Sequence, residues 1–436
     1  MKRSLPLLLV YALFCGNAAA WSDHASLLWP LVRGIPAMLE PTLRVETLDA
    51  FIGAEADGIE RVLAEHEAWS RVTLAHYAPR PDALAFSADA PATVADPRAA
   101  FLAAIRVNPT LDYRPYRQTT VDDVIAADLP ALRFADLSFL STGVSHAEVL
   151  YLPLESGDRV ASAHVLASAS DEPDFGMDIG LFADNGTSFG AAYGFGEQPF
   201  GNPNLDYGSQ APFHMGFYHL DWLTRTAQPD LLRTYPQWRI TQYRALAELA
   251  FATGHDYWGW RFMGWALHYI GDLTQPYHAE PLPGVSTVEA LWLVARGKTT
   301  EAVQLVSNRH GVLESYQYQR VMAALRARAW SNPLLAAIAG GAPVPVFETL
   351  TPSTTLSAES VAAGDALDAA LENHVPARFV SDTSFEWTGS GEEAGIVAAV
   401  TAAGGEASLR ALDAAVAEQM QRFSRYARAW INLEYA

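Results

Sequence analysis

Cysteine is almost absent from this chain of 436 residues, because Cys15 is the only one. It lies inside an N-terminal segment, residues 1–20, that has the composition of a signal peptide. Without this segment the chain has no cysteine, which excludes a disulfide framework, although an exported protein would be allowed one. A lipid anchor on Cys15 is also disfavoured, since the bulky Phe14 stands where such sites require a small residue.

The N-terminal segment has the three parts of a secretory signal peptide. A short basic start, Lys2 and Arg3, precedes an apolar stretch over residues 4–14, and three alanines at residues 18–20 form the cleavage site. The apolar stretch is too short to span a membrane. We therefore expect cleavage before Trp21 and a protein that is secreted or periplasmic.

Positive charge is also scarce, since the formal net charge is −20. Such a surface repels nucleic acid phosphates, so no stable nucleic acid partner is expected. A metal enzyme that acts on a phosphate ester is not excluded, because its ions supply the positive charge. Long apolar runs are missing after the leader, so the sequence predicts no transmembrane anchor.

Strand-like alternation is rare, whereas apolar residues at helical spacing recur along the chain. Half of the residues are hydrophobic, which suffices for a large core. We predict an all-α fold with many helices around one core, in a single domain over residues 21–436. Residues 171–212 are rich in Gly, Asn, Asp and Pro and predict a long functional loop. Residues 339–357 predict a surface connection.

The segment "HYIGDLTQPYH", residues 268–278, has the features of a metal site. His268 and Asp272 are four residues apart, so on a helix they share one face. Pro276 ends that helix, and His278 follows from the next turn. Three ligands of compatible type are what a zinc site needs. The alternative is a hydrogen-bonded polar patch in a helix interface.

Two further places offer ligands. His310 and Glu314 are four residues apart in a predicted helix, so they share a face. At the expected mature N-terminus, His24 follows three residues after Trp21. The free amine and the carbonyl oxygen of Trp21 could chelate a metal ion in a five-membered ring.

These residues resemble those of the bacterial zinc-dependent phospholipases C and the related single-strand-specific nucleases. The family motif is His, two residues, Gly-Asp, two residues, Gln-Pro, one residue, His, and residues 268–278 match it throughout. The resemblance implies that Trp21 and His24 bind zinc, as the N-terminal Trp and a following His do in the family. It also gives His310 and Glu314 the place of the family's later His-Glu pair.

Two more ligands are implied by the resemblance, an Asp and a His before the central motif. Asp174 in "DEPDFG" is the first candidate for the Asp, and Asp178 and Asp206 are alternatives. His214 is the candidate for the His, with His219 as a close rival. The interval between Asp174 and His214 is longer than in the family.

The resemblance further implies a trinuclear zinc hydrolase that cleaves phosphodiester bonds. Asp272 would bridge two ions, with Trp21, His24, Asp174, His214 and His268 around them. His278, His310 and Glu314 would hold the third ion. Zinc-bound hydroxide would attack the phosphate, and Asp174 would act in catalysis by orienting or deprotonating the water.

Two branches of the family share the motif and differ in substrate. Glu314 matches the phospholipase C branch, whereas the nucleases usually have Asp there and also carry disulfides. Aromatic residues of the Gly-rich segment could contact acyl chains, stack on bases, or simply pack the loop: Phe182, Phe189, Tyr193, Phe195, Phe200 and Tyr207. We favour a phospholipid substrate. The alternatives are a nuclease of the same fold and an exported zinc-binding protein without activity.

One rival motif and several isolated histidines have simpler explanations. "GTSFG" fits the pattern around a nucleophilic Ser188, but neither a strand before it nor a helix after it is predicted, which indicates a turn. Six histidines lack a partner at ligand spacing and are interpreted as surface or core residues: His66, His76, His146, His164, His255 and His374.

Overall fold

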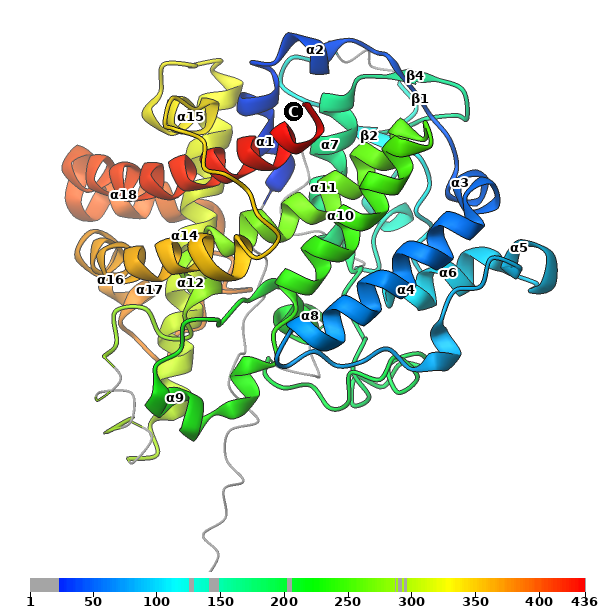
Figure 1. The fold of residues 1–436 in the computed structure, drawn as a ribbon. Helices are drawn as coiled ribbons and strands as arrows, with labels where there is room; N and C mark the ends of the chain where they lie inside the picture. Colours follow the sequence, from blue (N-terminus) through cyan, green and yellow to red (C-terminus); the bar gives the residue numbers. More distant parts are fainter. Residues whose placement is uncertain are drawn as a thin grey trace, which may run out of the picture.

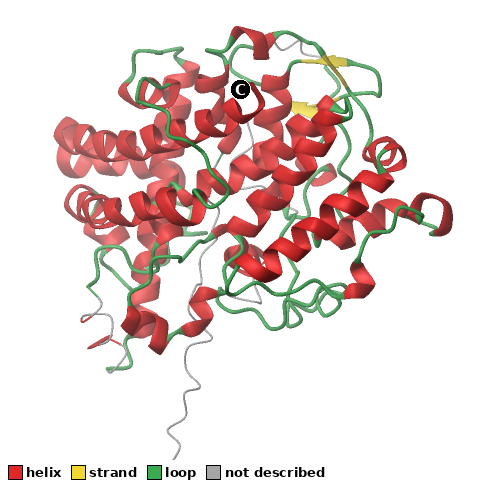
Figure 2. Ribbon diagram, viewed as in Figure 1, coloured by secondary structure: helices red, strands yellow, loops and turns green. Residues whose placement is uncertain are grey.

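The computed structural model describes residues 23–124, 129–140, 149–201, 206–286, 288, 292–293 and 296–435. The chain is mostly helical, with 60% helix and 3% strand, in agreement with the predicted all-α class. The little β-structure is two antiparallel pairs of short strands, as Figure 2 shows for the upper right of the molecule. The pairs are β1 (Leu43–Arg44) with β4 (Arg159–Val160), and β2 (Tyr116–Gln118) with β3 (Tyr151–Pro153).

Two antiparallel helices, α10 (Pro236–Ala252) and α11 (Asp256–Leu273), cross the middle of the molecule (Figure 1). Gly254, with φ of +82°, supplies the left-handed residue that ends α10 and allows the tight return. Every residue of α11 after Asp256 is buried. A helix that is buried on all sides lies in the centre of a fold. The side chains of α11 are therefore packed by surrounding residues, which restricts their movement.

Helices from the N-terminal part cover one side of this central pair, on the right in Figure 1. Side-chain caps mark two of their starts, since the side chains of Thr47 and Asp96 accept hydrogen bonds from the backbone N–H groups of Ala50 and Ala99. The elements are α3 (Leu48–Ala54), α4 (Ala56–Thr73), η1 (Asp82–Leu84), α5 (Ala90–Thr93) and α6 (Pro97–Ile105).

The C-terminal helices pack on the opposite side, on the left in Figure 1. In α18, Gly405 has φ of +61°, so the long segment is two helices joined at a kink. The apolar face of its last part belongs to the core, since Met420, Phe423 and Trp430 are buried. The elements are α14 (Thr299–Arg326), α15 (Pro333–Ala339), η5 (Pro352–Leu356), α16 (Ser357–His374), α17 (Ala377–Val380), η6 (Glu393–Gly395) and α18 (Ile396–Tyr435).

The remaining elements include those that carry much of the candidate site. They are α1 (His24–Val32), α2 (Pro36–Leu39), η2 (Phe134–Asp136), α7 (Ser162–Asp171), η3 (Glu172–Phe175), α8 (Asp206–His214), α9 (Trp222–Ala227), η4 (Pro229–Leu232) and α12 (Pro276–Ala279). One large hydrophobic cluster runs from α1 to α18. No helix within the described residues is long and apolar enough to cross a membrane.

Two segments that the sequence predicts as loops contain some regular structure. In residues 171–212, the described part from 176 to 201 forms turns, but η3 occupies its start and α8 begins at Asp206. Residues 339–357 end in the turn η5, and Phe347 packs its buried ring on Trp430 although the adjacent Val346 is exposed. This connection therefore also contributes to the core.

Candidate metal centre

The stretch from His268 to His278 is two helices joined by a sharp turn. His268 and Asp272 lie one turn apart on α11, and His268 Nε2 is 3.5 Å from Asp272 Oδ2. The helix ends at Leu273, and Pro276 occupies the first turn of α12, where its missing N–H and fixed φ are tolerated. His278 is thus carried by a short helix rather than by the loop that the sequence predicted.

His24, the first residue of α1, packs directly against α11. Its Nε2 is 3.4 Å from Asp272 Oδ1, and its ring centroid is 4.1 Å from that of His268. A Cβ atom at Gly271 would lie 2.8 Å from the His24 ring, closer than real contacts allow. Glycine at position 271 is therefore required for the approach of α1 to the two ligands on α11.

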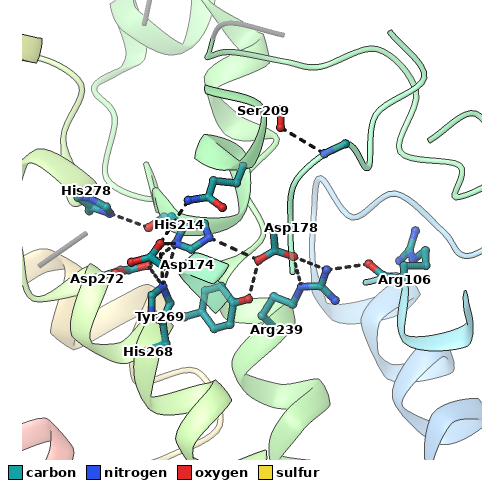
Figure 3. Close-up of polar contacts among 12 residues, drawn as sticks. Arg106, Asp174, Asp178, Ser209, His214, Arg239, His268, Tyr269, Asp272 and His278 are labelled. Carbon is teal, nitrogen blue, oxygen red and sulfur yellow. Dashed lines mark hydrogen bonds and ion pairs between the residues drawn. The ribbon is translucent and has the colours of Figure 1, made fainter. Parts of the chain in front are cut away.

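His268 presents a lone pair to the centre of this group. Its Nδ1 donates a hydrogen bond of 2.7 Å to the backbone carbonyl of Ser170, so in the neutral ring Nε2 carries no proton. Burial lowers the pKa of His268 well below its usual value, which keeps the ring neutral. Its Nε2 lies 3.0 Å from His214 Nδ1 and 3.7 Å from Asp174 Oδ1 (Figure 3). This orientation is what a metal-ligating histidine needs.

His214, at the end of α8, stands among three carboxyl groups. Its Nδ1 is 3.0 Å from Asp272 Oδ2 and 3.8 Å from Asp174 Oδ1, and its Nε2 is 3.5 Å from Asp178 Oδ2. Burial opposes its protonation, but the contacts with Asp178 and Asp272 raise its pKa to about 10. Protonated His214 would partly offset the charge of these carboxylates. A divalent cation would have to displace that proton from Nδ1.

Asp178 supports the site from behind. It accepts hydrogen bonds from the Arg239 guanidinium and the Tyr269 hydroxyl while it faces His214 Nε2 (Figure 3). Arg239 is fully buried and donates to the carbonyls of Ile105 and Arg106. Because its oxygens are engaged in this way, Asp178 orients His214 rather than joining the ligand group, and Asp178 is not supported as the ligand.

Of the aspartates that the sequence offers before the central motif, Asp174 is the one that lies with His214 and His268. It belongs to η3, and 15% of its side chain is exposed, whereas His214, His268 and Asp272 are completely buried. Burial raises its pKa to about 7, with Asp272 adding to the shift and His214 opposing it. Asp174 therefore faces the more open side of the site.

His219, the rival of His214 in the sequence, lies away from the clustered ligands. Its Nε2 is 2.9 Å from the Ser357 hydroxyl, and His219 belongs to none of the groups that could hold a metal ion. His214 is therefore the histidine of this pair that meets the other ligands. The side chain of Asp206, the remaining candidate for the aspartate, lies outside the described residues.

A second group of three residues lies beyond His214. His278 Nε2 is 3.1 Å from His310 Nε2, which is 2.7 Å from Glu314 Oε1. His278 Nδ1 donates to the His214 carbonyl at 3.0 Å, which leaves Nε2 unprotonated in the neutral ring. Burial lowers the pKa of His278 to about 3 and raises that of Glu314. The His278–His214 hydrogen bond also joins the two groups.

The structure thus assembles eight of the nine expected ligands. We call His24, Asp174, His214, His268 and Asp272 the first cluster, and His278, His310 and Glu314 the second cluster. In each of three sets of three, the ligand atoms lie within 4.8 Å of one another: His24, His268 and Asp272; Asp174, His214 and His268; and His278, His310 and Glu314. The ninth residue, Trp21, lies outside the described residues, as does the predicted signal peptide.

Buried polar atoms in the first cluster indicate that these residues fit a cation. Within the described part of the chain, both ring nitrogens of His24 and Oδ1 of Asp272 are buried and have no hydrogen-bond partner. Burying such groups unpaired costs about 1–3 kcal/mol each. Nitrogen and oxygen ligands that converge in this way suit zinc and other first-row divalent ions.

The residues that support the clusters were not foreseen from the sequence. The Ser170 carbonyl, Arg239 and Tyr269 lie 98, 61 and 91 residues from the groups that they contact. No local pattern marks them, because a backbone carbonyl has no residue signature and buried Arg and Tyr are common in cores. Only the spacing of the ligands themselves was visible.

The aromatic residues of the Gly-rich segment are largely core. Phe182, Tyr193, Phe195 and Phe200 are buried, and Phe189 is half-buried against Tyr193. The side chain of Tyr207 lies outside the described residues. The interpretation that these rings pack the loop is therefore the correct one for the four buried rings.

Ser188 is exposed in a turn, with no strand directly before it and no helix directly after it, because the described residues 176–201 form only turns and bends. The serine-nucleophile pattern is therefore coincidental here. The isolated histidines also have ordinary surroundings. His76 is exposed, His146 lies outside the described residues, and the others contact Thr241, Trp29, Glu46 and Ser408: His66, His164, His255 and His374, respectively.

Comparison with known proteins adds no relative to this picture. No protein-family model, no curated protein and no solved structure matches the chain. The candidate site consists of two joined clusters of buried imidazoles and carboxylates that could hold metal ions.

Proposed function

We propose that the protein is an exported hydrolase that uses three zinc ions to cleave phosphodiester bonds, of the phospholipase C type. The observation that carries the proposal is the convergence of eight expected ligands on two adjoining clusters. These residues come from six elements spread between His24 and Glu314, so the arrangement is not a consequence of local sequence. When bound, such ions lower the pKa of water and neutralise the charge of a phosphate ester.

The side chains divide the work between holding and reacting. His24, His268 and Asp272, which would lie around the inner ions with His214, are buried and fixed. Asp174 is the most exposed ligand of the first cluster, so water and substrate can approach it, and a carboxylate in that place can act as a general base. We assign Asp174 the role of orienting the attacking water or accepting its proton. No serine or cysteine nucleophile is required.

Three features favour a phospholipid over single-stranded nucleic acid. Glu314 rather than Asp completes the second cluster, and the net charge of −20 repels a polyanion. The lack of cysteine after residues 1–20 adds to this, because the nucleases usually carry disulfides. The same site could serve a nuclease, which remains the second candidate on the strength of the shared motif.

The test is metal analysis of the processed protein together with two hydrolysis assays. We expect close to three zinc ions per chain, cleavage of a chromogenic phosphocholine ester, and loss of both after chelation. Zinc should restore the activity. Faster cleavage of single-stranded DNA than of the phosphocholine ester would transfer the proposal to the nuclease branch. A metal-loaded protein that cleaves neither substrate would identify a non-catalytic zinc-binding protein.

A further inference from the structure

Two buried glutamines stand beside the clusters, one at each. Gln210 lies on α8, one helical turn before His214. Gln275 precedes α12 and stands between Asp272 and His278 in the chain. Both side chains are completely buried. A buried amide must find partners for its N–H and carbonyl groups, or its burial costs free energy.

Each glutamine donates to the carboxylate of its cluster. Gln210 Nε2 donates to Asp174 Oδ1 at 3.2 Å, and Gln275 Nε2 donates to Glu314 Oε1 at 3.4 Å. In both cases this is the oxygen that faces the cluster's imidazoles. Glu314 Oε1 lies 2.7 Å from His310 Nε2, and Asp174 Oδ1 lies 3.7 Å from His268 Nε2. The amide N–H therefore holds the ligand oxygen itself.

The carbonyl oxygens of both amides, Oε1 of Gln210 and Oε1 of Gln275, are buried and have no hydrogen-bond partner among the described residues. Rotating either amide by half a turn would place its carbonyl oxygen against a carboxylate oxygen, and two acceptors repel each other. The carboxylates thus fix the orientation of both amides. In that orientation each amide carbonyl oxygen can accept a hydrogen bond, and no described residue donates one.

Gln275 has an additional role in the backbone. Its N–H donates to the Asp272 carbonyl at 2.9 Å, and its carbonyl accepts from the His278 N–H at 3.0 Å. One residue is therefore tied to a ligand of the first cluster, to a ligand of the second cluster and, through its side chain, to Glu314. The side chain of Gln210, in contrast, donates its hydrogen bond to Asp174 of the first cluster.

We propose that Gln210 and Gln275 are positioning residues, one for each cluster, that orient the ligand carboxylate through the amide N–H and accept a hydrogen bond from a water molecule in the site through the amide carbonyl. The proposal rests on the proposed function in that the clusters hold metal ions. It adds two residues that do not bind metal but decide how firmly Asp174 and Glu314 do.

The test compares methionine variants, which keep side-chain length and remove the amide. We expect Gln210→Met to weaken metal binding about 10- to 100-fold at the first cluster alone, and Gln275→Met to do so at the second. The readouts are chelator competition for each zinc ion and the visible spectrum of the cobalt-substituted protein. In each variant the spectrum should change for one class of ion.

Gln237 provides a matched control. It is also buried, but both ends of its amide are paired. Its N–H donates to the Thr349 carbonyl, and its carbonyl accepts from the Ser353 N–H. Neither partner belongs to a cluster. Gln237→Met should lower the melting temperature and leave zinc affinities and the cobalt spectrum unchanged. Unchanged affinities in Gln210→Met and Gln275→Met, or equal changes in Gln237→Met, would overturn the proposal.

The outcomes separate this proposal from the proposed function. If the unmodified protein binds zinc but cleaves no phosphodiester, the function fails while the affinity comparison still decides the role of the glutamines. If the variants bind zinc as tightly as the unmodified protein and that protein is active, the function stands and the glutamine proposal fails. A protein that binds no metal ion at all would refute both.

Discussion

The first cluster takes its ligands from α1, η3, α8 and α11, whereas the second takes its ligands from α12 and α14 only. The first therefore spans residues 24–272, and the second residues 278–314. Asp178, Arg239 and Tyr269 stand behind the first cluster, and the second is held by the His214 carbonyl and Gln275. The first cluster therefore needs the packing of distant segments to bring its residues together. The second needs only two neighbouring helices, but its position is tied to the first cluster through the His214 carbonyl.

The largest effect is expected from Asp272→Asn, which removes the carboxylate at the centre of the first cluster. Asp272 contacts His24, His214 and His268, so its loss should release the ions of the first cluster and lower hydrolysis by at least about a thousandfold. Zinc analysis and the phosphocholine ester assay measure this. Asp57→Asn, an exposed position on α4, is the control. Full zinc content in Asp272→Asn would contradict the central role of Asp272.

Glu314→Gln should disturb only the second cluster. The amide keeps the shape but loses the charge that faces His310, so we expect the loss of one ion and a decrease in hydrolysis of about a hundredfold. Glu418→Gln, exposed on α18, should change neither. If all ions leave together in Glu314→Gln, the two clusters form one cooperative unit, and the distinction drawn between them is wrong.

Tyr269→Phe tests the support behind the first cluster without removing a charge. The variant loses the hydrogen bond to Asp178, while Arg239 still pairs with that carboxylate. We expect unfolding to become easier by about 1 kcal/mol and zinc affinity at the first cluster to fall several-fold, with the second cluster unchanged. Denaturant unfolding measures the change in the free energy of unfolding, and chelator competition measures the change in zinc affinity. An equal loss of affinity at both clusters would argue for a general structural effect.

His66 lies outside the clusters, so its replacement should have the smallest effect on zinc binding and hydrolysis and should change only the pH dependence of stability. Burial lowers its pKa to about 3, with Arg106 and Arg80 adding to the shift, and its Nε2 is 2.9 Å from the Thr241 hydroxyl. Below pH 6.5 the unfolded chain binds a proton at His66 that the folded protein does not. Stability should therefore fall by about 1.4 kcal/mol per pH unit between roughly pH 6.5 and pH 3 on account of this residue.

The measurement is the free energy of unfolding of His66→Gln and the unmodified protein between pH 5 and pH 7.5. The variant should lose stability more slowly on acidification, with unchanged zinc content at pH 7.5. Parallel curves for the two proteins would show that His66 does not carry this dependence.

Spacing along the chain predicted the pairs that lie on one helix. His268 with Asp272 and His310 with Glu314 share faces because α-helices place residues four apart side by side, and both helices were visible as apolar patterns. The grouping of Asp174 and His214 with them follows only from the family resemblance, which leaves Asp174, Asp178 and Asp206 as alternatives. Asp178 resembles a ligand in sequence because its partner, Arg239, lies 61 residues away.

The sequence by itself determined the helical class, the ligand pairs on α11 and α14, and the turn that brings in His278, because these follow from periods of a few residues and from proline. The tertiary structure alone decided which of Asp174 and Asp178 groups with the other candidate ligands, which ring nitrogen of His268 and of His278 faces inward, and which aromatic rings are buried. Those outcomes depend on contacts between segments far apart in the chain, such as Ser170 with His268 and His24 with Gly271. The physical reason is that a local pattern fixes the direction of a side chain, whereas its partner is fixed by packing.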